Sequence, residues 1–264
     1  MENITIIGGG NLGKSIAIGL VKSNLYSANE IMVTGRSLNR LALIKESLAV
    51  AVSTENAVAI QDSKYVILCV QPKQLPSLLA EIQPALKPEQ VLISTITGVS
   101  IADIEAMVEG NKVLRAMPNT AASKLQSITC IACNENAKSE LDQVQMIFRT
   151  IGKTLVIGES LMQSATVLGA SGIAFFLRYI RAVTQGGIQM GFHPGEAQLI
   201  AVQTAIGAAT LVAENNTHPE REIDKVTTPM GCTIAGLNEM EHQGLSSAVI
   251  KGLMASYEKI NHIK

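Results

Sequence analysis

The first part of the chain alternates short apolar runs with longer stretches that are predicted to be helical. The runs expected to form buried strands are Ile4–Ile7, Ile31–Thr34, Tyr65–Val70, Val91–Ile96 and Lys112–Ala116. The helices expected between them are Leu12–Ser23, Asn39–Leu48, Gln74–Ile82 and Ile101–Val108. This alternation is typical of a mostly parallel sheet covered on both faces. A strand at Ser127–Cys133, a helix at Lys138–Arg149 and a strand at Thr154–Ile157 are expected to complete the sheet.

Strand patterns end near Gly158, and the remaining sequence predicts helices only. They are expected at Leu161–Met190, Pro194–Glu214, Pro229–Gln243 and Leu245–Ile260, separated by Gly191, the Asn215–Glu220 loop and Gly244. We therefore predict an α/β Rossmann-type domain over 1–158 and an all-α domain over 159–264. The helical half is rich in Ala and Gly, and it has more apolar residues than a monomer of this size could easily bury. We therefore expect a homodimer that forms through these helices, with a ring of several dimers as a larger alternative.

Composition excludes several classes of protein. Hydrophobic residues make up 47% and charged residues 16% of the 264 positions, which argues against disorder. A net charge of −1, no run of Lys or Arg and no Trp argue against a nucleic-acid surface. The opening MENITIIGGG has no basic lead, and the uncharged runs Leu161–Leu177 and Ala197–Ala213 are short and rich in small polar residues. We expect buried helices of a soluble, cytoplasmic protein that binds no membrane.

The cysteines and histidines predict no metal or redox centre. Cys130 and Cys133 form a CxxC within SITCIAC, but residues three apart on a strand point to opposite faces. We interpret both as ordinary strand cysteines. The four histidines are scattered without the spacing of metal ligands, so no metal site is proposed: His193, His218, His242 and His262.

The stretch ITIIGGGNLGKS places three glycines in G-x-G-x-x-G spacing directly after a strand and at the start of a helix. Gly8 permits a tight turn, Gly10 lets backbone amides reach a pyrophosphate, and Gly13 lets the helix pack on the strand. A merely tight strand-to-helix turn is the alternative. The position of the triplet in an alternating half favours a dinucleotide site.

The end of the second expected strand indicates which dinucleotide is bound. An NAD site places an acid there for the ribose 2′-hydroxyl, but no Asp or Glu lies between Ile31 and Lys45. Arg36 instead stands between Thr34 and Ser37, and a guanidinium beside hydroxyls suits a 2′-phosphate. The alternative is a solvated loop arginine. We predict NADPH, with NADH as the second possibility.

The stretch TTPMGCTIAGL reads as the start of a helix. Thr228 suits the cap and Pro229 the first helical position, yet no acid follows in the first turn. Either an ordinary cap satisfies the free amides, or a ligand brings the negative charge.

Several stretches resemble the pyrroline-5-carboxylate reductase family, in the family's order and over nearly the whole chain. They are IGGGNLG (7–13), YVILCVQP (65–72), VLRAMPNT (113–120), GASGIAF (169–175), AVQTAIGAA (201–209) and TTPMGCTIAGL (227–237). The resemblance implies an oxidoreductase that reduces the cyclic imine 1-pyrroline-5-carboxylate to L-proline with NAD(P)H, in proline biosynthesis. It also implies a helical dimerisation domain.

The resemblance, carried over motif by motif, implies two sets of site residues. The cofactor contacts are Ile7, Gly8, Gly9, Gly10, Asn11, Leu12, Thr34, Arg36, Asn56, Cys69, Val70, Gln71, Pro72 and Thr97. Gly13 of the glycine spacing and Ser37 beside Arg36 complete the predicted cofactor residues. The substrate contacts are Glu159, Thr166, Ser171, Cys232 and Thr233. An ordinary Asn at a helix start is the alternative for Asn56. Thr233 is the catalytic candidate, because its hydroxyl is placed to bond the imine nitrogen. The cofactor carries the hydride, so no nucleophile or metal is required.

Some positions depart from the family pattern. The family usually writes SPGG(T/S)T where this chain has TPMGCT, and SGSGPAY where it has GASGIAF. An acid that is common in the family is Gln163 here. Met230 and Ile173 therefore motivate an alternative substrate, a related cyclic imino acid. A non-catalytic NADP-binding paralogue is the third reading.

Overall fold

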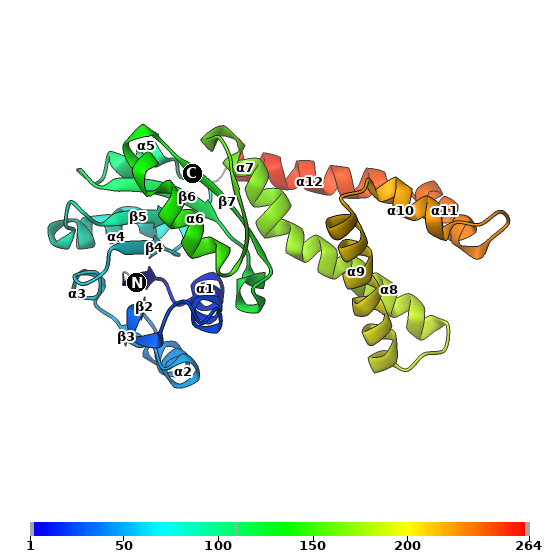
Figure 1. Cartoon of the computed structure of the whole chain (residues 1–264), viewed down its shortest axis with the longest axis horizontal. Helices are drawn as coiled ribbons and strands as arrows, with labels where there is room; N and C mark the ends of the chain where they lie inside the picture. The colour runs from blue at the N-terminus through cyan, green and yellow to red at the C-terminus, as the bar shows by residue number, and fades with distance from the viewer. Residues whose placement is uncertain (1–2, 109, 262–264) are drawn as a thin grey trace. The chain divides into compact units, whose positions relative to one another are not determined.

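The computed structural model describes residues 3–108 and 110–261, so His262 of the scattered histidines lies outside it. The chain divides into two compact units (Figure 1). One comprises Met1–Ser171 with Ser256–Lys264, and the other comprises Gly172–Ala255. Each unit is described separately.

The described part of the first unit contains an eight-stranded sheet in the order β3-β2-β1-β4-β5-β6-β7-β8. The strands are β1 (Ile4–Ile7), β2 (Ile31–Thr34), β3 (Ala51–Ser53), β4 (Tyr65–Leu68), β5 (Val91–Ser94), β6 (Lys112–Met117), β7 (Ser127–Cys133) and β8 (Gly152–Val156). Neighbouring strands are parallel except β6 and β7, which are antiparallel. The predicted mostly parallel sheet is confirmed. Strand β3 was not predicted, because its three residues are exposed or half-buried and form no apolar run.

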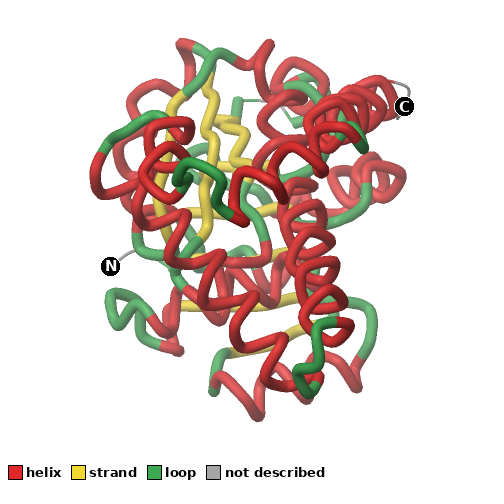
Figure 2. The backbone as a smooth tube through the Cα atoms, turned by 90° about the vertical axis from the view of Figure 1, so that its right-hand side faces the viewer, coloured by secondary structure: helices red, strands yellow, loops and turns green. Residues whose placement is uncertain are grey.

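Helices cover both faces of this sheet and form a separate hydrophobic core on each. Figure 2 traces the strands and the helices along the backbone. On one face lie α1 (Asn11–Lys22), α2 (Leu38–Leu48) and α6 (Leu141–Arg149). On the other lie α4 (Leu75–Ile82) and α5 (Ile101–Glu105), with the short α3 (Asn56–Ala59) beside α4. Alternate strand residues supply the two cores: Ile6 packs in the first and Ile7 in the second. The 3-10 helices are Ala28–Glu30, Pro72–Gln74, Gln83–Ala85, Thr120–Lys124 (η4), Glu135–Glu140 (η5) and Glu159–Leu161 (η6).

A segment that the sequence assigned to the helical domain packs on the sheet instead. It comprises η6, α7 (Met162–Ala165) and a π-helical turn, η7 (Thr166–Ser171). Met162 is buried against Met117 of β6 and Ala132 of β7. The first compact unit therefore ends after Ser171, whereas the predicted division at Gly158 follows the last strand.

The second unit is helical. Its helices are α8 (Gly172–Gln189), α9 (Pro194–Asn215), α10 (Pro219–Val226), α11 (Cys232–His242) and α12 (Leu245–Asn261), whose end belongs to the first unit. Helices α8 and α9 pack closely, and a Cβ on Gly187 would meet that of Ala197 at 2.9 Å. Helix α10 was not predicted, because PEREIDKV is mostly charged and follows a loop-like sequence.

The predicted start of α11 at Pro229 is wrong. The helix begins at Cys232, after a turn in which the Gly231 amide donates to the Thr228 carbonyl at 3.0 Å. Met230 lies in this turn with φ 57°, a left-handed conformation that a right-handed helix cannot include. Thr228 therefore closes the turn and is not the helix cap.

The expectation of buried helices in the second half is also wrong for the single chain. Glu159–Gln189 and Pro194–Glu214 are long and apolar enough to cross a membrane by length and composition, and 28% and 11% of their most apolar windows are buried. Large side chains on them face outward, including Phe176, which is 73% exposed, and Leu199, which is 69% exposed. These helices expose apolar surface that an isolated soluble chain rarely leaves uncovered.

Candidate functional site

The glycine turn between β1 and α1 has the geometry expected of a pyrophosphate-binding loop. The amides of Gly8 and Gly9 donate to the Thr34 carbonyl at 3.0 and 2.8 Å, which fixes the turn against β2. Gly8 has φ 115°, and a Cβ there would meet the Cys69 carbonyl oxygen at 2.5 Å. Helix α1 begins without a side-chain cap and without an acid in its first turn. Its free amides are therefore available to an anion.

A cavity of about 610 Å³ lies in front of this turn, at the carboxyl ends of the strands. The predicted cofactor residues that line it are Ile7, Gly8, Gly9, Gly10, Thr34, Arg36, Ser37, Asn56, Cys69, Val70 and Gln71. The remaining ones are not among its lining residues: Asn11, Leu12, Gly13, Pro72 and Thr97. Gly13 acts indirectly, since a Cβ on it would collide with the carbonyl of Gly8. The carboxyl edge of a parallel sheet is where such folds bind ligands.

Sequence reasoning missed part of the lining. The additional residues are Gly35, Arg40, Leu41, Thr54, Lys73, Gln74, Ser77, Leu78 and Glu81. Arg40 is the most informative, because it brings a second guanidinium to the cavity that Arg36 lines. It lies in the first turn of α2, where the Ser37 hydroxyl accepts the Arg40 amide at 3.4 Å. Its spacing of four residues from Arg36, next to a helix start, is a signal that the sequence contained.

Thr34 and Asn56 meet in the cavity although they are far apart in the sequence. The Thr34 hydroxyl donates to Asn56 Oδ1 at 2.6 Å, and Asn56 Nδ2 donates to Glu81 Oε2 at 3.2 Å. The Thr34 hydroxyl proton is thus used to orient Asn56, and the acid Glu81 is tied to the same network. Nothing in the local sequence of α4 indicated Glu81.

Cys69 is the first residue after β4, and it lines the cavity beside the glycine turn. Burial raises the pKa of its thiol to about 12. The sulfur therefore stays a neutral thiol in the physiological range and contributes shape to the cavity, with no thiolate chemistry. Burial also raises the pKa of Cys130 and of Cys133, the two strand cysteines.

Glu159 connects two parts of the first unit. Its Oε1 accepts the Ile101 amide of α5 at 2.7 Å and Arg115 Nη1 at 3.3 Å. Arg115 is 4% exposed, and burial lowers the pKa of its guanidinium while Glu159 opposes that shift. Among the described residues, Arg115 Nε and Nη2 have no partner. Both contacts use Oε1, and the Glu159 side chain is 33% exposed. Among the described residues, Oε2 is therefore the oxygen that is left for a ligand.

The other predicted substrate residues occupy two different units. In the first unit, the buried Thr166 hydroxyl donates to the Met162 carbonyl at 2.8 Å, so it can serve a ligand only as an acceptor. Ser171 is the last residue of the π-helical turn and is half-buried. In the second unit, Cys232 and Thr233 form the first turn of α11, which has no acid and no side-chain cap. The acid-free helix start expected from the sequence is confirmed, three residues further along.

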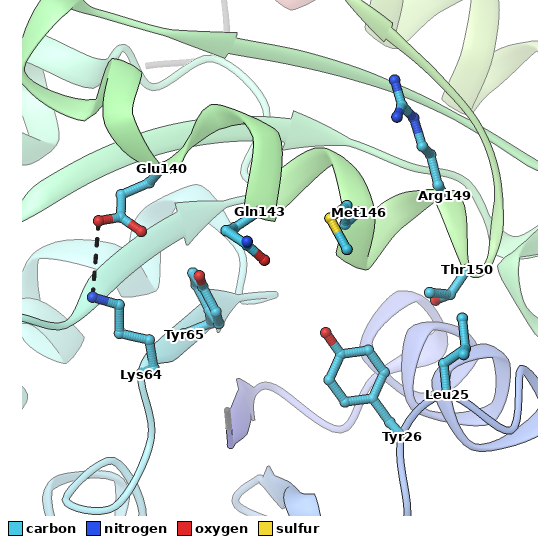
Figure 3. A pocket seen from close by; sticks show the side chains of 9 residues that line it. All are labelled: Leu25, Tyr26, Lys64, Tyr65, Glu140, Gln143, Met146, Arg149 and Thr150. Carbon is cyan, nitrogen blue, oxygen red and sulfur yellow. Dashed lines mark ion pairs between the residues drawn. The ribbon is translucent and has the colours of Figure 1, made fainter. Parts of the chain in front are cut away.

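A second cavity of similar size, about 630 Å³, lies at the opposite edge of the sheet (Figure 3). Its lining side chains come mainly from α6 and from the start of β4. Tyr26 and Tyr65 flank it, and Lys64 Nζ lies 3.8 Å from Glu140 Oε1. This is the amino-terminal edge of the strands, away from the glycine turn between β1 and α1. The two cavities have similar volumes, so the first is the candidate cofactor site because of its position beside the glycine turn.

Comparison with known proteins places the chain in a family. Residues 159–263 match the family model described as pyrroline-5-carboxylate reductase dimerisation, and residues 3–98 match that described as NADP oxidoreductase, coenzyme F420-dependent. Pyrroline-5-carboxylate reductase 2 of Dictyostelium discoideum is 42% identical over 98% of this chain and 92% of its own length. The chain belongs to the pyrroline-5-carboxylate reductase family. The family resemblance read from the motifs is confirmed.

Other relatives agree. Pyrroline-5-carboxylate reductase 1 of Dictyostelium discoideum is 46% identical over 98% of this chain, which spans only 49% of that protein's length. The solved pyrroline-5-carboxylate reductase of Coxiella burnetii is 30% identical with a TM-score of 0.86, and the alignment covers 98% and 97% of the two chains. The Plasmodium falciparum pyrroline carboxylate reductase, solved with NADP bound, has a TM-score of 0.90 over 98% and 97% of the chains. At 23% identity it supports the fold alone.

Proposed function

We propose that the protein is an NADPH-dependent reductase of 1-pyrroline-5-carboxylate that forms L-proline. The observation that carries the proposal is the cavity at the carboxyl edge, where the Gly8–Gly10 turn, Arg36 and Arg40 line one space. Family membership supports the cyclic imine as substrate, and the match of residues 3–98 to a family model described as NADP oxidoreductase supports the cofactor.

The first unit is proposed to hold the cofactor. The uncapped start of α1 receives the pyrophosphate, because free amides and the helix dipole favour an anion there. Arg36 and Arg40 receive the 2′-phosphate, and the absence of an acid at the end of β2 avoids repulsion. The bound nicotinamide supplies the hydride.

The start of α11 is proposed to hold the substrate carboxylate. Its first turn offers amides that no side chain of its own caps, and the preceding Gly231 lets a ligand approach the backbone. The Thr233 hydroxyl is proposed to bond the imine nitrogen of the same substrate. Positioning by a single hydrogen bond to a neutral group contributes about 0.5–1.5 kcal/mol, or roughly tenfold in rate.

The test measures oxidation of NADPH with 1-pyrroline-5-carboxylate, beside NADH and a six-membered cyclic analogue. We expect turnover of the five-membered ring with NADPH, and about a tenfold lower kcat in Thr233→Val with the NADPH Kd unchanged. Binding of NADPH without turnover of either imine would contradict the proposed reaction. An unchanged kcat in Thr233→Val would remove Thr233 from the mechanism.

A related cyclic imino acid is the second candidate substrate. Met230 and Ile173 stand where the family usually has Gly and Pro, and Met230 takes a left-handed backbone conformation that favours glycine. Turnover of the six-membered analogue alone would favour this candidate.

We also propose a homodimer through the second unit, in the cytoplasm. The exposed apolar side chains of α8 and α9 lie within the residues that match the dimerisation model. A second copy would remove such an apolar surface from water. The many Gln, Thr and small residues of these helices support subunit packing over insertion into a bilayer. A ring of several dimers is a larger assembly that the same surface permits.

A further inference from the structure

Three positions of VLRAMPN hold the segment Glu159–Ser171 against the sheet. Arg115 bonds Glu159 at the start of the segment, and Met117 packs with Met162 in its middle. Just past the end of β6, Asn119 Nδ2 donates to the carbonyl of Gly169, near the end of the segment, at 2.9 Å. Alternate residues of a strand point to one face, so β6 and the residues after it contact the segment at successive points.

The side-chain oxygen and nitrogen of Asn119 and its backbone amide each make a hydrogen bond. It is 5% exposed, and its Oδ1 accepts the Ala121 amide at 3.0 Å as the cap of η4. Its own amide donates to the Ser127 hydroxyl at 3.0 Å. A side chain with both ends engaged keeps a single rotamer, so the donor that it presents to Gly169 has a fixed position.

The element that Asn119 holds is the π-helical turn Thr166–Ser171. Such turns are rare and are frequently found at functional sites. A Cβ on Gly169 would lie 3.4 Å from the Ile128 side chain, so this turn also sits close to β7. Ser171, a predicted substrate contact, is the last residue of the same turn.

We propose that Asn119 is a positioning residue for the reductase reaction: its bond to the Gly169 carbonyl fixes the π-helical turn that presents Ser171 to the substrate. The inference rests on the proposed function. Asn119 itself touches neither substrate nor cofactor, and it acts through the turn. Misplacing a substrate-positioning group by about 1 Å lowers catalysis by roughly a hundredfold.

The test uses Asn119→Asp. The carboxylate keeps an oxygen to cap η4, because Asp and Asn are equally good caps, but it has no donor for the Gly169 carbonyl. We expect kcat/KM for the imine to fall by about tenfold to a hundredfold, with the NADPH Kd unchanged. Hydrogen exchange of residues 166–171 should rise.

Asn134→Asp is the matched control. Asn134 caps η5 through Oδ1, which accepts the Ala137 amide at 3.2 Å, and its Nδ2 donates to Glu105 at 2.8 Å. The same substitution there removes a side-chain donor away from the π-helical turn. It should leave kcat/KM and the exchange of 166–171 unchanged.

Asn119→Ser is a second variant, because the buried carboxylate of Asn119→Asp could prevent folding. A serine hydroxyl caps η4 but is too short to replace the amide donor. Wild-type kcat/KM in either folded Asn119 variant overturns the inference. If the wild type reduces no cyclic imine, the proposed function fails, and exchange then decides the inference. Faster exchange of 166–171 in Asn119→Ser, with none in Asn134→Asp, supports it, and equal exchange overturns it.

Discussion

At the scale of single residues, the choice of dinucleotide depends on two arginines. Arg36 follows β2 and Arg40 lies in the first turn of α2, and both line the cavity beside the glycine turn. The carboxylate of Glu81 also lines it but accepts a bond from Asn56. An adenosine 2′-phosphate would therefore meet two cations at the place where NAD sites carry an acid.

We expect Arg36→Ala with Arg40→Ala to weaken NADPH selectively. Loss of charge-assisted hydrogen bonds of about 1.5–3 kcal/mol raises the KM for NADPH by roughly tenfold to a hundredfold. The KM for NADH, which lacks the phosphate, should change little. Steady-state kinetics with both cofactors measure this ratio, and Arg149→Ala, at the other cavity, is the control. Equal losses for NADH and NADPH would contradict the assignment.

At the scale of elements, the start of α5 is held from three directions. Ser100 accepts the Asp103 amide at 3.0 Å, and the Asp103 carboxylate accepts the Ser100 amide at 3.0 Å. Glu159 receives the Ile101 amide. The bonds from Ser100 hold the pKa of Asp103 below its usual value. This short helix therefore depends on its cap more than on its length.

Removing the cap should destabilise the fold in a pH-dependent manner. Ser100→Ala is expected to lower the free energy of unfolding by about 1 kcal/mol at neutral pH, measured by urea denaturation. A lowered folded pKa means that Asp103 stabilises the fold above its unfolded pKa, near 4, and that this contribution is lost as pH falls through the folded value. The difference between wild type and Asp103→Asn should therefore shrink below pH 4. A constant difference would contradict this account.

At the scale of the whole molecule, the exposed apolar helices of the second unit are the surface proposed for the homodimer. A charge placed in a buried subunit interface is costly to desolvate. Leu199→Asp on α9 is therefore expected to weaken the dimer, seen as a smaller species in sedimentation at equal concentration. Leu43→Asp is the matched control, because Leu43 is also exposed but lies on α2 of the first unit. An intact dimer in Leu199→Asp would place the interface elsewhere.

Particular elements show how far sequence reasoning reaches. The strands around the glycine turn were predicted because buried parallel strands are continuous apolar runs, and β3 was missed because its residues are partly exposed. Pro229 looked like a helix start by local preference, but the left-handed Met230 delays α11 to Cys232. Arg40 had a local signal in its spacing from Arg36, whereas Glu81 had none.

The sequence alone determined that the sheet is mostly parallel, where the glycine turn lies, that no acid follows β2, and the family. Each of these depends on residues that are neighbours in the chain. Only the tertiary structure decided that Asn56 meets Thr34, that Glu159 bonds both Ile101 and Arg115, and that Asn119 holds Gly169. These pairs join residues far apart in the chain, and side-chain hydrogen bonds between distant segments leave no periodic pattern in a single sequence.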